Sequence, residues 1–199
     1  MRKKDLELEL QKLEGFDKPN AELEQYRTPP ELASSVLWSI YLKGEISDKR
    51  IYDLGCGTGT LGIGAKILGA EKVVCVDADG DAIDIAKRNA DSAGVEVEFR
   101  TMDVRDVSGS GDLVIQNPPF GSQKRGSDRP FIEKSLEIAP VVYSFHMEET
   151  DGFVRKYVER CGGTVISSQT VDFPLERTMP WHTENIESIR VGFYRFERS

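Results

Sequence analysis

The stretch DLVIQNPPF, residues 112–120, decides how the rest of the chain is interpreted. Its apolar half predicts a short buried strand. Its second half cannot continue that strand, because Pro118 and Pro119 have no N–H to donate to a β-ladder. The strand therefore ends near Gln116, and the NPPF motif lies just beyond its carboxyl end. In an open α/β sheet ligands bind at this edge, so the motif predicts a functional site held by two rigid residues.

A second motif, IYDLGCGTG at residues 51–59, predicts a strand that runs into a glycine-rich turn, followed by a helix over residues 60–68. Glycines let a backbone approach a ligand closely, and a glycine-rich turn between a strand and a helix is typical of nucleotide-binding loops. The turn lacks the Gly-Lys-Ser/Thr sequence of a phosphate loop, which argues against an NTPase.

Two later strands are expected to end in acids. The segment 71–77 ends in Asp77, and an acid at the end of the second strand holds ribose hydroxyls in Rossmann-type sites. Asp79 suits the N-cap of the next helix, which stops at Gly94. The segment 95–104 contains Asp103, whose position alone fits a turn former as well as a ligand.

The order of elements predicts the topology. Strand and helix alternate five times, which implies a parallel sheet, and two strands without a full helix between them follow, so the last strand should run antiparallel. Residues 1–45 are expected to form a helical cap on a catalytic sheet over residues 46–199, all in one domain. In that cap, Thr28, Pro29 and Glu31 have the spacing of a capping box that starts the second helix.

Composition excludes several classes of protein. The 199 residues contain no apolar run of transmembrane length and no secretory signal, so we expect a cytoplasmic protein without membrane contact. Its three cysteines show no metal-ligand spacing and are expected to be reduced and buried, so no metal site is predicted. The net charge of −8 argues against a protein that binds nucleic acid tightly on its own, but permits a local basic patch or a partner subunit.

Such a patch is expected after the NPPF motif, in GSQKRGSDR at residues 121–129. The segment is either a solvated loop or a lid that meets substrate phosphates, and the cluster of Lys124, Arg125 and Arg129 in an acidic chain favours the lid. Ser127 or Asp128 is expected to cap the helix that follows.

Three separated motifs carry a family resemblance. The NPPF motif resembles the catalytic motif of amino-group methyltransferases that use S-adenosylmethionine. Together with EQYRT at residues 24–28 and VYSFH at residues 142–146, it resembles the methyltransferase-like protein 5 family over nearly the whole chain. These enzymes methylate adenine N6 in small-subunit ribosomal RNA. The resemblance implies a seven-stranded Rossmann-like methyltransferase fold, a mostly parallel α/β sheet with the last strand antiparallel and helices on both faces.

The resemblance also assigns site residues. The Asn117 side-chain oxygen and the Pro118 carbonyl would accept hydrogen bonds from an exocyclic NH2, which favours a pyramidal nitrogen with a usable lone pair, and Phe120 would stack on the base. The catalytic candidates are Asn117, Pro118, Pro119 and Phe120. The candidates for S-adenosylmethionine binding are Gln25, Thr28, Asp53, Gly55, Gly57, Thr58, Thr60, Asp77, Asp103 and Val104.

The chain departs from the family pattern at two places. Met147 stands where the family has a lysine after the histidine, and His146 itself is interpreted as structural rather than as a base. Residues 174–187 are basic in the family, whereas this chain has Glu184 and Glu187. Trp181 in this segment either stacks on a base or closes the sheet.

The resemblance implies an RNA substrate and a small zinc-containing activator subunit that covers an exposed sheet edge. Three alternatives stay open: a methyltransferase for a DNA amino group, a methyltransferase for protein glutamine, and a non-catalytic scaffold that binds the cofactor or a ribosomal partner. The chain has no separate target-recognition segment, which argues against a sequence-specific DNA enzyme, and its intact NPPF motif argues against a scaffold.

Overall fold

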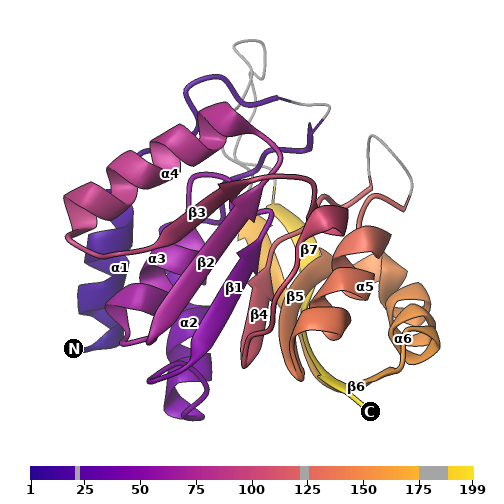
Figure 1. Ribbon diagram of the computed structural model, residues 1–199. Coiled ribbons are helices and arrows are strands. Elements are labelled where there is room, and N and C mark those ends of the chain that lie inside the picture. Colours follow the sequence, from indigo (N-terminus) through magenta and orange to yellow (C-terminus); the bar gives the residue numbers. More distant parts are fainter. Residues whose placement is uncertain (21–22, 122–125, 175–187) are drawn as a thin grey trace.

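The computed structural model describes residues 1–20, 23–121, 126–174 and 188–199 (Figure 1). Its centre is a seven-stranded sheet in the order β3-β2-β1-β4-β5-β7-β6, in which only β7 runs antiparallel to its neighbours. The predicted fold class is confirmed. The strands are β1 (Arg50–Leu54), β2 (Lys72–Asp77), β3 (Glu98–Thr101), β4 (Leu113–Gln116), β5 (Val141–Met147), β6 (Gly163–Pro174) and β7 (Ser188–Arg198).

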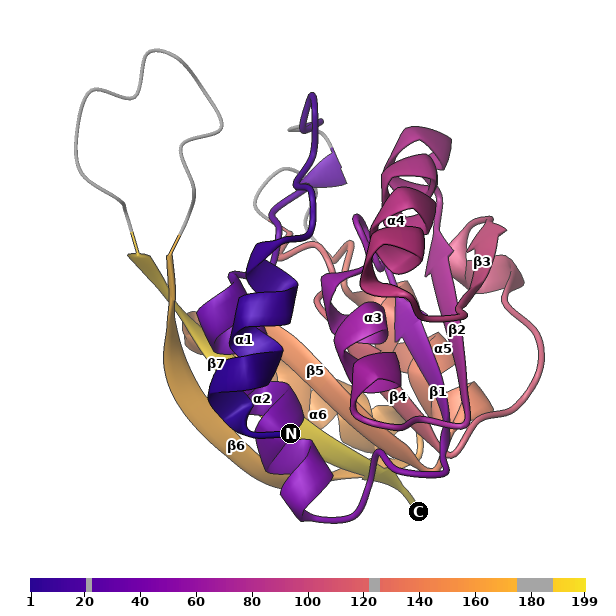
Figure 2. The same ribbon diagram turned by 90° about the vertical axis from the view of Figure 1, so that its left-hand side faces the viewer.

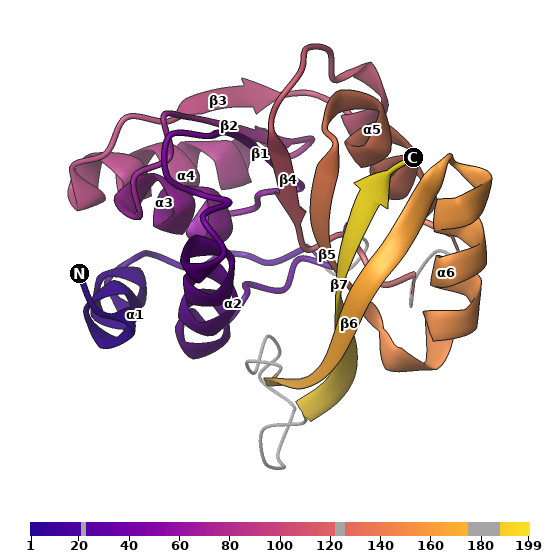
Figure 3. The same ribbon diagram turned by 90° about the horizontal axis from the view of Figure 1, so that it is seen from below.

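Helices cover both faces of the sheet. Helices α1 to α4 lie on one face, and α5 and α6 lie on the other (Figure 3). Helices α1 and α2 lie side by side and pack on α3 (Figure 2), so the N-terminal segment shares the core of the sheet. The helices are α1 (Lys3–Gln11), α2 (Pro30–Leu42), α3 (Thr60–Ile67), α4 (Gly80–Ala93), α5 (Arg129–Ile138) and α6 (Asp151–Arg160).

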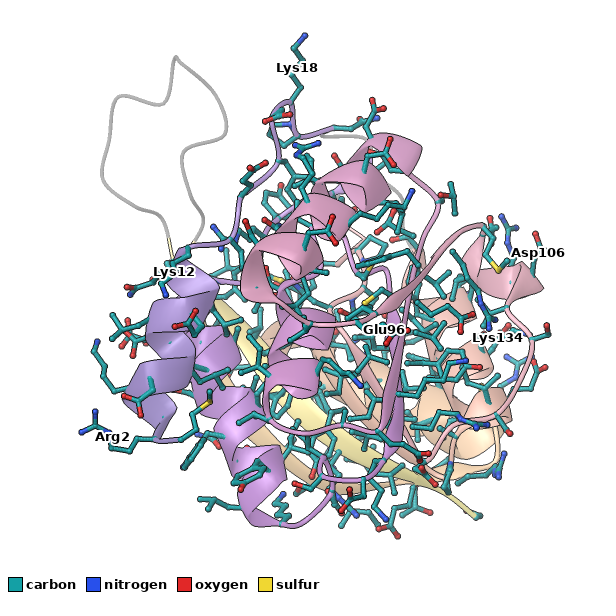
Figure 4. All side chains as sticks on the ribbon, turned by 60° about the vertical axis from the view of Figure 1, so that its left-hand side comes forward. Arg2, Lys12, Lys18, Glu96, Asp106 and Lys134 are labelled. Atoms are coloured by element: carbon teal, nitrogen blue, oxygen red, sulfur yellow. The ribbon has the colours of Figure 1, made fainter. Side chains whose placement is uncertain are left out.

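The surface is charged and the interior is apolar. Charged side chains such as Arg2, Lys12 and Lys18 point away from the body of the molecule (Figure 4). None of the helices in the described ranges combines the length and the apolar character that crossing a bilayer requires.

Close packing of α3 explains the two glycines inside this helix. A Cβ at Gly62 would collide with Cys75 Sγ on β2, and a Cβ at Gly64 would lie 2.5 Å from Leu37 Cδ1 on α2. The glycines therefore weaken the helix intrinsically but allow it to approach both the sheet and the neighbouring helix.

The predicted capping box at the start of α2 is wrong. The helix begins at Pro30, its N-cap is Pro29, and no side chain caps it. The reason is local: a residue before proline is disfavoured in the α region, so Pro29 stays extended at ψ 138° and the helix starts one residue later than the box requires. The Thr28 hydroxyl is thereby left for a distant partner.

Two further boundaries differ from expectation. Asp128 occupies the N-cap of α5, but its side chain makes no capping hydrogen bond and faces His146 instead. Strand β3 is shorter than the predicted 95–104, because the N–H of Val95 closes the end of α4 by donating to the Ala90 carbonyl and because Val104 starts a 3-10 turn, Val104–Asp106. The N-cap assigned to Asp79 is confirmed, since its side chain accepts from the Asp81 N–H.

Candidate active site

The glycine-rich turn and the NPPF motif meet at the carboxyl edge of the sheet. Strands β1 and β4 pair in parallel, with Leu54 opposite Gln116, so the segments that follow them leave the sheet side by side. The strand order reverses between these two strands, which is where open α/β sheets bind ligands. A cavity of about 350 Å³ opens there, lined by Asn117, Pro119 and all ten cofactor candidates: Gln25, Thr28, Asp53, Gly55, Gly57, Thr58, Thr60, Asp77, Asp103 and Val104.

Asp77 organises the glycine-rich turn. Its carboxylate accepts from the Gly57 N–H at 2.8 Å and from the Asp79 N–H at 2.9 Å, and burial raises its pKa. Gly57 has a φ of +52°, and a Cβ there would lie 2.7 Å from Phe16 Cζ. The turn therefore needs glycine both for its conformation and for the aromatic ring that packs on it.

The carboxyl group of Asp53 lines the cavity and is almost completely buried. It is 1% exposed, and its Oδ2 accepts from the Gly62 N–H at 2.7 Å. Its Oδ1 has no hydrogen-bond partner among the described residues. Burial raises the pKa of this carboxyl group to about 7. An orphaned buried acceptor in a cavity of this size fits a ligand that brings a donor or a positive charge.

Asp103 lies on the opposite rim and stays ionised. It forms an ion pair with Arg105 at 2.6 Å, and hydrogen bonds from that arginine lower the Asp103 pKa to about 2. A carboxylate oxygen can accept further donors, so the position remains able to accept from an amino group. Val104, the next residue, opens the 3-10 turn.

The segment 23–28, which we call the strap, holds three parts of the site together. Gln25 Nε2 donates to Asp79 Oδ2 at 2.6 Å, and Thr28 Oγ1 accepts from Asn117 Nδ2 at 3.2 Å. Glu24 Oε2 accepts from the Gly121 N–H at 3.0 Å, directly after the NPPF motif. Glu24 is 7% exposed and has a φ of +51°, a costly conformation for a non-glycine residue that is typically retained at functional sites.

The contact with Thr28 orients the amide of Asn117. Because Nδ2 donates to the threonine hydroxyl, Oδ1 is the atom left for other partners. Asn117 Oδ1 is buried and has no hydrogen-bond partner within the ranges that the structure describes. A rigid, desolvated acceptor of this kind is suited to take a donor from a ligand, since an unpaired buried oxygen is otherwise costly.

A second cavity of about 520 Å³ adjoins the first, and Tyr26 and Gly126 line both. Phe120 lines the second cavity and packs edge-to-face on Phe173, with ring centroids 5.9 Å apart. Asn117 and Phe120 thus face neighbouring cavities, whereas Pro118 is buried and lines neither. The two cavities are therefore distinct but share a wall at Tyr26 and Gly126.

Sequence reasoning missed three residues that shape the first cavity. Phe16 is a lone aromatic in a polar segment and Phe131 lies on an amphipathic helix, so neither residue was predicted to line the cavity. The Phe131 ring lies against the glycine turn, where a Cβ at Gly55 would be 2.9 Å from it. Glu24 lies in the EQYRT motif but received no role of its own, because the sequence does not reveal a positive φ outside glycine.

The expected basic lid is only partly described. Arg129 lines the second cavity, and its guanidinium carbon lies 5.1 Å from the centroid of the Phe153 ring, an arrangement typical of cation–π contacts. Lys124 and Arg125 lie outside the described residues, as do Trp181, Glu184 and Glu187.

Known proteins resemble this chain in sequence and in fold. Residues 31–138 match the methyltransferase small domain family, and the chain belongs to this family of methyltransferases. The chain is 36% identical to the rRNA N(6)-adenosine-methyltransferase METTL5 of Danio rerio, covering 98% of this chain and 99% of that protein. It is 35% identical to Mettl5 of Drosophila melanogaster, covering 96% and 94%. Within the small domain family, the chain therefore belongs to the METTL5 group.

A solved structure agrees with this assignment. The crystal structure of a Pyrococcus horikoshii protein, described as a candidate RNA methyltransferase, has a TM-score of 0.92 and 40% identity, covering 100% of this chain and 98% of that one. The likeness extends over the strap and the last two strands as well as the central sheet.

The strap can be tested by calorimetry. Replacing Glu24 with alanine is expected to weaken binding of S-adenosylhomocysteine about tenfold, because it removes a charged acceptor from the Gly121 N–H and loosens the cover of the first cavity. Glu24→Gln keeps an oxygen acceptor in the same place and is the matched control, expected to bind within about threefold of wild type. Equal affinities for wild type and the alanine variant would show that the strap does not hold the ligand.

Proposed function

We propose that the chain transfers a methyl group from S-adenosylmethionine to the exocyclic N6 of an adenine in structured RNA, specifically small-subunit ribosomal RNA. The observation that carries the proposal is the buried Asn117 Oδ1, which has no partner in the described part of the chain and is oriented by Thr28 next to a cavity that contains Phe120. The METTL5 relatives support the choice of adenine N6 and of ribosomal RNA.

The first cavity fits the methyl donor. Bound S-adenosylmethionine supplies an electrophilic methyl group on a sulfonium. Asp77 lies where acids accept from ribose hydroxyls, Asp103 can accept from an adenine amino group, and Asp53 offers its free oxygen to a cationic or hydrogen-donating group. Phe16 and Phe131 pack on the glycine turn and exclude water from this side of the cavity.

The NPPF motif prepares the acceptor. A base that has left its stack would lie on Phe120 in the second cavity and present its amino group to Asn117. Asn117 Oδ1 and the Pro118 carbonyl would accept the two amino hydrogens, which concentrates the nitrogen lone pair toward the first cavity. The nitrogen would take the methyl group as its bond to the sulfonium sulfur breaks, which leaves S-adenosylhomocysteine, and would then release a proton to water, so no strong base is needed.

Charge and sheet edges support a partner subunit, which we propose to be a small zinc-containing activator. The net charge of −8 opposes tight RNA binding by the chain alone. Strands β3 and β6 are the outer strands of the sheet, and an outer strand can pair with another chain. We also propose a cytoplasmic location, where the free thiols of Cys56, Cys75 and Cys161 would stay reduced.

The test is transfer of labelled methyl to unmodified small-subunit rRNA, with and without the activator, followed by digestion to nucleosides. Label on N6-methyladenosine confirms the proposal. Label that appears only on a protein fraction or on DNA identifies one of those substrates instead. Absence of transfer to any fraction, while S-adenosylhomocysteine still binds, would indicate a scaffold.

A further inference from the structure

A row of four buried polar side chains runs inward from the second cavity. Asp128 lines that cavity, and its Oδ2 lies 3.3 Å from His146 Nδ1. His146 Nε2 lies 2.8 Å from Ser144 Oγ, which accepts from Gln116 Nε2 at 3.0 Å. Gln116 and Ser144 are 0% exposed, His146 is 1% exposed and Asp128 is 7% exposed. Within the described residues Gln116 Oε1 is left without a hydrogen-bond partner, whereas the other contacts of the row are made in the protein interior, where hydrogen bonds are stronger than in water.

The two ends of the row bracket the catalytic segment. Gln116 is the last residue of β4 and directly precedes Asn117, whereas Asp128 is the N-cap of α5. Ser144 and His146 lie two residues apart on β5 and therefore point to the same face of the sheet. The row thus ties both ends of the segment 117–127 to one interior strand.

The row can be tested through the tautomer of the histidine. Ser144 Oγ accepts from Gln116 Nε2, and its own hydrogen can be donated to His146 Nε2. Nε2 is then bare, and the neutral imidazole carries its proton on Nδ1, which lies 3.3 Å from Asp128 Oδ2. With this tautomer, Gln116, Ser144 and His146 all present their hydrogens in the direction of the second cavity.

The row does not form a hydrolase triad, although its order is Asp–His–Ser. Ser144 is fully buried and already accepts from Gln116, so no substrate carbonyl can reach its Oγ. His146 is enclosed by the rings of Tyr194 and Phe196, with centroids 5.7 and 6.1 Å away. The row can therefore act only through the residues at its two ends.

We propose that Gln116, Ser144, His146 and Asp128 are positioning residues for the methyl acceptor. They hold Asn117 at the first cavity and Phe120 at the second, and Asp128 forms part of the wall against which the acceptor nucleotide rests. This role depends on the proposed methyl transfer, in which small displacements of a reacting group are expensive: a misplacement of about 1 Å can cost about 100-fold in rate.

The first experiment determines which nitrogen of His146 carries the proton, and it needs no substrate. The chain has two histidines, so the variant His182→Asn leaves His146 as the sole imidazole for nitrogen NMR. The neutral tautomer with the proton on Nδ1 is expected, and Ser144→Ala should shift the Nε2 resonance. A proton on Nε2 in the parent protein would overturn the proposed row, whatever the activity of the enzyme.

The second experiment separates positioning from stability. His146→Phe removes the hydrogen bond to Ser144 and the polar contact with Asp128, and His146→Asn retains a side-chain N–H donor. We expect kcat for RNA methylation to fall at least about tenfold in the phenylalanine variant and to return to within about threefold of wild type in the asparagine variant. Binding of S-adenosylhomocysteine should stay within about twofold in both. Ser144→Ala is a milder variant should His146→Phe not fold, with the same expected direction.

The matched control is Tyr194→Phe, which keeps the ring beside His146 but loses the hydrogen bond from Tyr194 Oη to Asp151. It should lower thermal stability and leave kcat within about twofold. Equal kcat values for wild type, His146→Phe and Ser144→Ala would refute the positioning role. If the wild-type enzyme transfers no methyl group to RNA, the proposed function is refuted instead. The tautomer of His146 then shows independently whether the hydrogen-bonded row exists.

Discussion

Replacing Asn117 with alanine is expected to lower kcat for methyl transfer at least about 100-fold, the usual cost of losing one preorganised group that stabilises charge in a transition state. The Oδ1 atom that disappears is the buried acceptor without a partner in the described chain, so few other contacts change. Binding of S-adenosylhomocysteine should change by less than about threefold, because Asn117 contributes only one edge of the first cavity. Single-turnover transfer to RNA and calorimetry measure the two effects separately.

Two companion variants distinguish the acceptor atom from its orientation. Asn117→Asp keeps an acceptor at the same place and should lose less activity than the alanine variant. Thr28→Val keeps the shape but removes the oxygen that accepts from Asn117 Nδ2, so the amide can rotate and kcat should fall about tenfold. An alanine variant that retained more than a tenth of wild-type kcat would contradict the catalytic role of Asn117.

Local sequence rules were sufficient for the sheet and for the place of the site. Prolines and glycines mark the ends of β4 and β1, and the parallel pairing of these strands brings the segments after them to one edge. Asp77 could be named because an acid at the end of the second strand holds ribose hydroxyls in Rossmann-type sites, whereas Asp53 and Asp103 were named from the family resemblance.

Local sequence rules could not predict the hydrogen bonds that join residues far apart in the sequence. The bond between Thr28 and Asn117 spans 89 residues of sequence, and the bond between Glu24 and Gly121 spans 97. A threonine before two prolines looks like a helix cap when it is considered locally, although its hydroxyl serves the opposite side of the site. Local propensity cannot predict the hydrogen-bond partner of Thr28, because that partner depends on where the strap crosses the edge of the folded sheet.

Buried polar residues were underestimated for the same reason. His146 was interpreted as structural, and its contacts with Ser144 and Asp128 emerge only when β5 lies between β4 and α5. Asp128 likewise looked like a cap, but its carboxylate faces the histidine. Sequence patterns locate apolar cores well because burial is periodic, whereas the pairing of buried polar groups has no such period.

The stability of the protein should depend on pH through Asp53. In the unfolded chain this carboxyl group has a pKa of 3.8, and in the folded protein burial raises the pKa to about 7, with the charge of Asp77 as a smaller cause. Between these values the folded state holds a proton that the unfolded state has released, so the free energy of unfolding falls as the pH rises from about 4 to about 7. Above pH 7 the full penalty is present, on the order of 4 kcal/mol for a shift of about three units.

Asp53→Asn removes this titration while keeping an oxygen for the Gly62 N–H. Urea unfolding should show that the free energy of unfolding of the variant rises relative to that of wild type by a few kcal/mol between pH 5 and pH 8, because titrating groups that do not interact with Asp53 cancel in the comparison. A difference in free energy of unfolding that is the same at both pH values would contradict the raised pKa.

Asp53→Asn should also bind S-adenosylhomocysteine at least about tenfold more weakly than wild type at pH 8, because the free Oδ1 acceptor in the cavity becomes an amide donor. Stability gained together with affinity lost would mean that the strained carboxylate is retained for its ligand.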